Sequence, residues 1–158
     1  MTVMTLPEWL DGLDPRPDVP TREQGVKWVI VLDRDLPRGL QVNAAACLAA
    51  AVGRAAPAIL GEPGLDADGG AHSGLPWTGC TVLAAPAAIV RAIRAEAVAA
   101  PDLLVTDMAA IAQRAGVYLD YLAELGRSRG DDLDYYAIGI LGPRSAVDRL
   151  TARLPLLR

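Results

Sequence analysis

Short apolar runs alternate with helix-forming stretches along most of this chain. Four runs predict strands, at 27–32, 81–84, 103–106 and 135–141. The segments 41–54, 86–99, 109–125 and 143–153 have the length and composition of helices. This alternation predicts an α/β protein, a three-layer α/β/α sandwich on a four-stranded sheet. The run 27–32 is apolar almost throughout, as in strands buried on both faces, so we expect it in the sheet interior.

Residues 1–25 predict an N-terminal arm, and residues 26–158 predict a single α/β domain. Four prolines, at positions 7, 15, 17 and 20, break any long helix in the arm. Trp9, Leu10 and Leu13 would give a short helix one apolar face, which can dock on its own domain or on a second subunit. The alternative is a loosely attached tail. Residues 55–76, rich in proline and glycine, predict a long irregular connection.

Charge and hydropathy exclude several classes of protein. The net charge of −4 disfavours nucleic acid as a partner, because that affinity comes mainly from clustered cations. No apolar run approaches the roughly 20 residues of a membrane-spanning helix. The first eight residues lack the basic-then-apolar order of a signal peptide. We therefore expect a cytoplasmic protein without a membrane partner.

Metal and cofactor motifs are missing from the sequence. Cys47 and Cys80 lie far apart and His72 is the only histidine, so an ordinary zinc site cannot be assembled. The turn at 37–41 matches neither the dinucleotide fingerprint nor the phosphate loop. We expect no metal and no cofactor, and the serine hydrolase, zinc protease and kinase signatures are absent.

Three titratable residues are candidates for catalytic proton transfer. Asp35 follows the first strand, where open α/β sheets commonly bind ligands, but it can instead cap or stiffen the turn. Asp107 ends the third strand, where it can orient a substrate, act as a base or cap the next helix. His72 lies in a glycine-rich loop, and the alternative is that it is merely exposed.

Two further patterns fall on predicted helices. Cys47 shares helical spacing with Ala44, Leu48 and Ala51, which predicts a packed core stripe. Tyr118 and Tyr121, three residues apart, are expected on one side of the helix over 109–125.

Two stretches carry a resemblance to a known family. The stretch 27–39, KWVIVLDRDLPRG, with its continuation over 43–47, resembles an uncharacterised bacterial family, domain-of-unknown-function family two thousand. Residues 136–144, YAIGILGPR, and the segments 147–151 and 154–158 resemble its closing signature. The resemblance covers roughly residues 26–158 and leaves out the arm.

That family is in turn similar in fold to the type II peptidyl-tRNA hydrolases, which need no cofactor and are usually dimeric. This resemblance implies a mixed sheet with at least one antiparallel strand, and a homodimer. By position, Asp35, Cys47 and Asp107 match the hydrolase pattern. The hydrolases have lysines where this chain has Leu40 and Val42. Without those cations an aspartate pair has little to stabilise an oxyanion or hold a phosphate, so tRNA is an unlikely partner.

The resemblance therefore implies the fold of the hydrolases with an altered, more apolar pocket. The residues expected to bind a small molecule there, besides the two aspartates, are Gly39, Leu40, Val42, Asn43, Met108 and Ile111. One interpretation is an enzyme acting on a small acyl, amide or ester substrate, with Asp35, Asp107 or His72 transferring protons. The alternative is a protein that binds a ligand or a partner without catalysis. True peptidyl-tRNA hydrolysis is the third interpretation.

Overall fold

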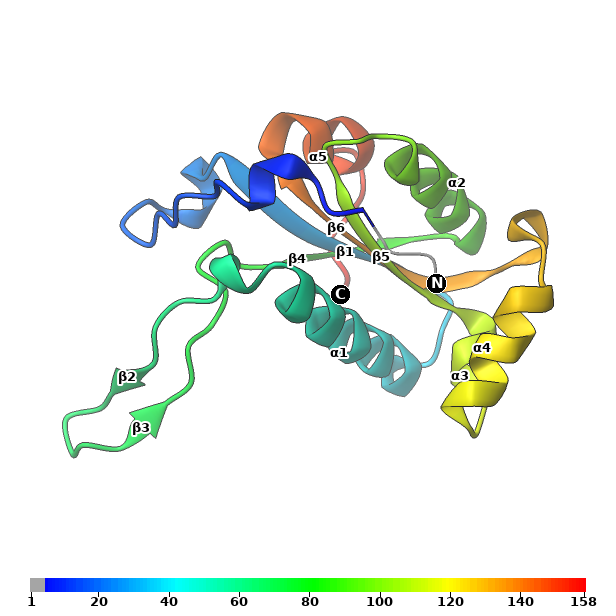
Figure 1. Ribbon diagram of the computed structural model, residues 1–158, viewed down its shortest axis with the longest axis horizontal. Helices are drawn as coiled ribbons and strands as arrows, with labels where there is room; N and C mark the ends of the chain where they lie inside the picture. Colours follow the sequence, from blue (N-terminus) through cyan, green and yellow to red (C-terminus); the bar gives the residue numbers. More distant parts are fainter. Residues whose placement is uncertain (1–4) are drawn as a thin grey trace.

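A four-stranded mixed sheet forms the centre of the computed structural model, which describes residues 5–158 (Figure 1). Its strands, in the spatial order β4-β1-β6-β5, are β4 Thr81–Ala85, β1 Val26–Asp33, β6 Tyr135–Pro143 and β5 Leu104–Ala109. β1 runs parallel to β4, whereas β6 is antiparallel to both β1 and β5. The predictions of an interior first strand and of a mixed sheet are confirmed.

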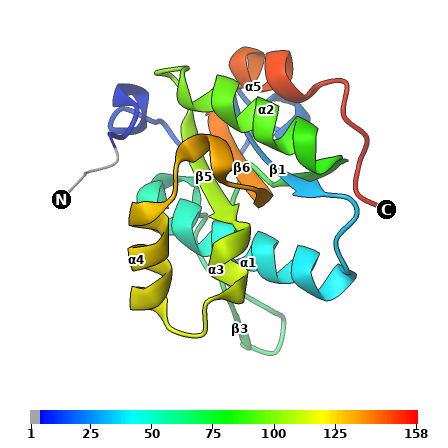
Figure 2. The same ribbon diagram turned by 90° about the vertical axis from the view of Figure 1, so that its right-hand side faces the viewer.

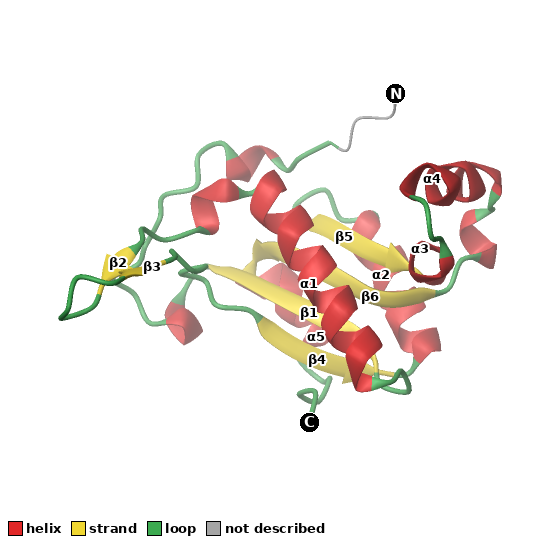
Figure 3. Cartoon of the chain, turned by 90° about the horizontal axis from the view of Figure 1, so that it is seen from below, coloured by secondary structure: helices red, strands yellow, loops and turns green. Residues whose placement is uncertain are grey.

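Helices cover both faces of this sheet, giving the three layers that the sequence predicts (Figure 3). The long helix α1, Arg38–Ala55, covers one face, and α2, Ala87–Val98, with α5, Arg144–Thr151, covers the other. Alternate residues of β1 feed the two cores. Val29 and Val31 pack towards α2 and α5, while Ile30 and Leu32 pack towards α1.

The predicted core stripe of α1 is right for Ala44 and Leu48 and wrong for Cys47 and Ala51. The buried residues of this helix are Gln41, Ala44, Leu48 and Val52, whereas Cys47 and Ala51 are exposed. Seven of the 18 residues of α1 are alanine and few are charged, so several faces are similarly apolar and the sequence does not mark the buried one.

The single helix predicted over 109–125 is two helices. β5 extends to Ala109, and α3, Ala110–Arg114, is followed by a break and then by α4, Tyr118–Arg127. The break contains Gly116 and the β-branched Val117, both unfavourable inside a helix. Figure 2 shows α4 beside α3 on the flank of the domain, next to the edge strand β5.

The connection between α1 and β4 projects from the body of the domain (Figure 1). It was expected to be irregular, but it contains a two-stranded hairpin, β2 Gly64–Leu65 and β3 Ala71–His72. Four short 3-10 helices complete the described chain: Glu8–Leu10, Thr21–Glu23, Pro57–Ile59 and Gly130–Asp132.

The N-terminal arm, whose first four residues lie outside the described part of the chain, packs on its own domain. Trp9, Leu10 and Leu13 contact the core layer beneath α1. The Trp9 indole also donates a hydrogen bond of 2.8 Å to the carbonyl oxygen of Asp102. The described arm is therefore held both by apolar contact and by a directed polar contact.

Candidate functional site

The carboxyl ends of β1, β4 and β5 lie at one edge of the sheet. The register fixes this, because Leu32 of β1 and Met108 of β5 both pair with Ala137 of β6. In open α/β sheets ligands bind outside the carboxyl ends of the strands. This edge therefore carries the turn after β1 and the segment from β5 into α3.

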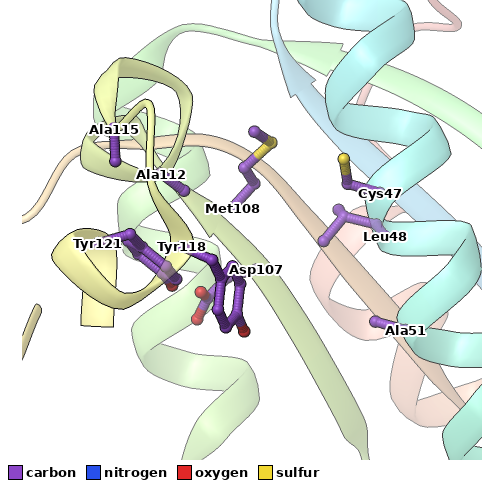
Figure 4. Close-up of a pocket in the computed structure, with 9 residues that line it drawn as sticks. All are labelled: Cys47, Leu48, Ala51, Asp107, Met108, Ala112, Ala115, Tyr118 and Tyr121. Carbon is purple, nitrogen blue, oxygen red and sulfur yellow. The ribbon is translucent and has the colours of Figure 1, made fainter.

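A cavity of about 420 Å³ opens here between α1 and the α3–α4 segment, beside the edge strand β5. It is lined by Cys47, Leu48, Ala51, Asp107, Met108, Ala112, Ala115, Tyr118 and Tyr121. In Figure 4 the α1 residues lie on one side, Asp107 and the two tyrosines on the other, and Met108 between them. We call it the α1–α4 cavity. Its volume lies in the range of small-molecule sites, and its walls are mostly apolar.

Asp107 is the one ionisable carboxylate in that lining, and an arginine holds it. Arg94 of α2 donates from Nε to Asp107 Oδ2 over 2.8 Å, and both side chains are only about 30% exposed. The Arg94 guanidinium also lies 4.6 Å above the ring centre of Tyr135. Asp107 Oδ1 receives no hydrogen bond from residues 5–158. The carboxylate is therefore oriented by one oxygen and can accept a donor with the other.

Two tyrosines of α4 stand beside this carboxylate. The rings of Tyr118 and Tyr121 meet edge to face, with centres 5.6 Å apart, as expected from their spacing. Burial raises the pKa of Tyr121 above its ordinary value of 10.0, and the negative charge of Asp107 raises it further. The Tyr121 hydroxyl is therefore protonated at neutral pH and can donate or accept a hydrogen bond.

The predicted binding residues lie in separate parts of the structure and do not line one cavity. Met108 lines the α1–α4 cavity, but Ile111 is buried in the opposite core layer. Val42 is 69% exposed and lines a second cavity on the other side of α1. Gly39, Leu40 and Asn43 lie in the first turns of α1 and line neither cavity.

The three predicted catalytic residues do not form one cluster. Asp35 lies exposed in the turn after β1, where its N–H donates to Asp33 Oδ1 over 3.0 Å and its carboxylate is 4.0 Å from Arg34 Nε. The carboxylate that stiffens the turn is thus that of Asp33. Asp107 caps no helix, since the strand continues two residues beyond it.

His72 lies in the projecting hairpin, away from the carboxyl edge of the sheet (Figure 1). Its ring nitrogen Nε2 is 3.1 Å from Asp66 Oδ2, and its side chain is 67% exposed. The carboxyl group of Asp66 also accepts the N–H groups of Asp68 and Gly70. These contacts hold the pKa of Asp66 below its ordinary value of 3.8, the His72 contact contributing most.

Sequence reasoning missed three contributors to the cavity. Cys47 was expected in the core, but its thiol lies on the cavity wall. The sequence placed Tyr118 and Tyr121 on one side of a helix but assigned them no role, because the break before α4, which turns them towards Asp107, was not predicted. Arg94 looks like an ordinary surface residue of an amphipathic helix, and no sequence signal links it to Asp107.

Residues 5–158 contain no group of three His, Cys, Asp or Glu side chains placed to share a metal ion. Within the same residues, no helix is long and apolar enough to cross a membrane.

The fold and this cavity define an α/β domain with a mostly apolar pocket at one edge of a mixed sheet. The model of a family described as "Protein of unknown function (DUF2000)" matches residues 26–158, and the chain belongs to that family. A solved structure of a protein of unknown function from Agrobacterium tumefaciens is similar in fold, with a TM-score of 0.78 and 19% sequence identity. The match covers 84% of this chain and 98% of that one. The comparison with curated proteins found no match.

Proposed function

We propose that this protein binds a small, mainly apolar molecule in the α1–α4 cavity. The observation that carries the proposal is a single carboxylate, fixed by Arg94 through one oxygen, on a mostly apolar wall. A few placed polar groups among apolar side chains are typical of small-molecule sites. The ligand class that fits is an aromatic or aliphatic molecule with one hydrogen-bond donor, such as a hydroxyl, an amide N–H or an ammonium group.

The polar end of the ligand is expected at Asp107 and Tyr121. Asp107 Oδ1 accepts the donor, and the protonated Tyr121 hydroxyl provides a second polar contact. The apolar part would lie against Leu48, Met108 and Ala112. Arg94 already compensates the charge of Asp107, so a neutral donor suits the site as well as a cation.

A thermal-shift screen of a metabolite library tests this proposal, with a cavity-filling variant as the discriminator. Ala51→Trp places an indole on the cavity wall, whereas Ala50→Trp adds the same indole to an exposed position of α1 that does not line it. We expect hits that shift the melting temperature of wild type and Ala50→Trp but not of Ala51→Trp. Hits that shift all three proteins equally would show that the ligand binds elsewhere.

A second candidate is an enzyme acting on a small acyl, amide or ester substrate. The observation that favours it is the presence of a thiol, Cys47, and a carboxylate, Asp107, on the wall of the same cavity. Asp107 would then accept the proton of the attacking group. Mass spectrometry of each thermal-shift hit after incubation separates the two functions. Turnover that is lost in Asp107→Asn favours the enzyme, and a shift without product favours binding.

Peptidyl-tRNA hydrolysis is the third candidate, and it rests on the resemblance to the type II hydrolases. Leu40 and Val42 stand where those enzymes have lysines, and acidic residues outnumber basic ones in this chain. We expect no cleavage of acetyl-aminoacyl-tRNA above background, and only weak association at ~0.15 M salt, because few cations are available for phosphate contacts. Cleavage that disappears in Asp107→Ala would restore this function.

We also propose that the chain forms a homodimer. Besides the resemblance, the exposed apolar side chains of α4 support this: Tyr118 is 71% and Leu119 72% exposed, and no residue of the helix is buried. Light scattering at micromolar concentration is expected to give twice the chain mass of 16.6 kDa. A mass of 16.6 kDa would refute the dimer, and Leu119→Lys is the variant expected to dissociate it.

A further inference from the structure

A second cavity, of about 390 Å³, lies on the other side of α1 from the α1–α4 cavity. It is lined by Leu32, Arg38, Gln41, Val42, Ala45, Val82, Leu157 and Arg158. Five of these side chains are apolar and two are arginines. We call it the α1–β4 cavity, because its walls come from α1, from β1 and β4, and from the last residues of the chain.

The C-terminal segment is fixed in place as one wall of this cavity. Its backbone runs along the edge of β4, where Ala84 N–H donates to Pro155 O over 3.0 Å and Leu157 N–H donates to Val82 O over 3.1 Å. These bonds cover the edge of β4, which β1 leaves unpaired. They also hold Leu157 opposite the exposed Val42 of α1, so the cavity has two apolar sides.

Two arginines, Arg38 and Arg158, are the only charged side chains in the lining of the α1–β4 cavity. Neither Arg38 nor Arg158 forms an ion pair within residues 5–158, whereas Arg34, Arg91 and Arg94 each have an acidic partner. No acidic side chain lines the cavity. Gln41, the other polar side chain there, already donates from Nε2 to the carbonyl oxygen of Asp33 over 3.1 Å.

We propose that the α1–β4 cavity is a binding site for an apolar carboxylate, separate from the site of the proposed function. The hydrocarbon part would lie between Val42 and Leu157, over Leu32 and Val82. The carboxylate would be held by the guanidinium groups of Arg38 and Arg158, which suit planar oxyanions. Two arginines that have no acidic partner within residues 5–158, set among apolar side chains, select against neutral molecules, which leave the guanidinium groups without a partner.

Calorimetric titration with octanoate tests the site, and octanol serves as the uncharged counterpart. We expect octanoate to bind more tightly than octanol, and Arg38→Ala and Arg158→Ala each to weaken octanoate binding about tenfold, as for loss of a charged hydrogen bond. Arg54→Ala, which removes an exposed arginine from the far end of α1, is the matched control and should leave the affinity unchanged.

A second variant separates this site from the α1–α4 cavity. Val42→Asp places a negative charge on the apolar wall at a position that is 69% exposed, so the fold should be retained. It is expected to abolish octanoate binding, whereas Ala51→Trp should not affect it. Equal affinity for octanoate in Arg38→Ala, Arg158→Ala and wild type would overturn the proposal. So would binding that is lost in Ala51→Trp and retained in Val42→Asp.

Discussion

The ion pair between Arg94 and Asp107 gives the sharpest stability prediction, because the pair is short, partly buried and joined to an aromatic ring. The two side chains are 30% and 26% exposed at 2.8 Å, and Arg94 also stacks on Tyr135. Arg94→Met keeps most of the packing but leaves the Asp107 carboxylate without its partner. Losing a charged hydrogen bond costs about 1.5–3 kcal/mol, and losing the cation–π contact adds about 0.5–1 kcal/mol.

Urea unfolding at pH 7 of wild type, Arg94→Met, Asp107→Asn and the double variant measures the coupling between the two side chains. We expect Arg94→Met to lower the free energy of unfolding by about 2–4 kcal/mol, with a coupling energy of about 1–2 kcal/mol. The matched control is Arg91→Met on the same helix. Arg91 is 40% exposed and 3.9 Å from Asp134, so its loss should cost no more than about 0.5 kcal/mol.

A coupling energy within experimental error of zero would refute the reasoning, because it would mean that the pair does not form in solution. The pair also has a functional consequence. Arg94 does not line the α1–α4 cavity, yet it orients the carboxylate that does. Arg94→Met is therefore expected to weaken ligand binding there as well as the fold.

Three other measurements test separate parts of the structure. With iodoacetamide at pH 8, Cys47 should react much faster than Cys80. Both side chains reach the surface, but partial burial raises the pKa of the Cys80 thiol to about 12. Equal rates, or faster labelling of Cys80, would contradict this. Because the pKa of Asp66 is lower in the folded protein, the ionised carboxylate stabilises the hairpin fully above pH 3.8, and this stabilisation is lost as the pH falls through the lower, folded pKa. His72→Ala should raise the pKa of Asp66 towards 3.8 in a carboxyl NMR titration. An unchanged pKa would show that the His72 contact is absent in solution. Gly139→Ala should destabilise the sheet by about 1–3 kcal/mol in urea, because its Cβ would lie 2.5 Å from Thr106 Oγ1; adding Thr106→Ala should recover part of that loss, and no recovery would place the strain elsewhere.

The fold could be predicted because its strands are short, apolar and separated by clear helix-forming segments. The interior position of β1 follows from the run of apolar residues after Lys27, which is typical of a strand buried on both faces. The resemblance to the hydrolases predicted at least one antiparallel strand but not which one, since nothing in the residues of β6 sets its direction.

The site could be predicted only in part, for reasons that particular residues make clear. Asp107 was placed after its strand, but pairing with Ile138 of β6 keeps it within β5 and turns its carboxylate towards Arg94. The exposure of Cys47 could not be read from an alanine-rich helix that lacks a polar face. Contacts such as Arg94 with Asp107 join different elements, and a single sequence carries no record of them.

The most direct measurement of the central proposal is ligand binding at the α1–α4 cavity followed by NMR, with a matched pair of probes. The probes are 3-phenylpropan-1-ol and its methyl ether, which share a ring and chain but differ in the hydroxyl donor. We expect the alcohol to perturb the amide signals of Met108, Ala112 and Tyr121 and to bind more tightly than the ether, because only the alcohol can donate to Asp107. Asp107→Ala should remove that difference, and Ala51→Trp should abolish binding while Ala50→Trp does not. Equal perturbation by both probes in wild type and Asp107→Ala, or binding that survives in Ala51→Trp, would contradict the proposed site.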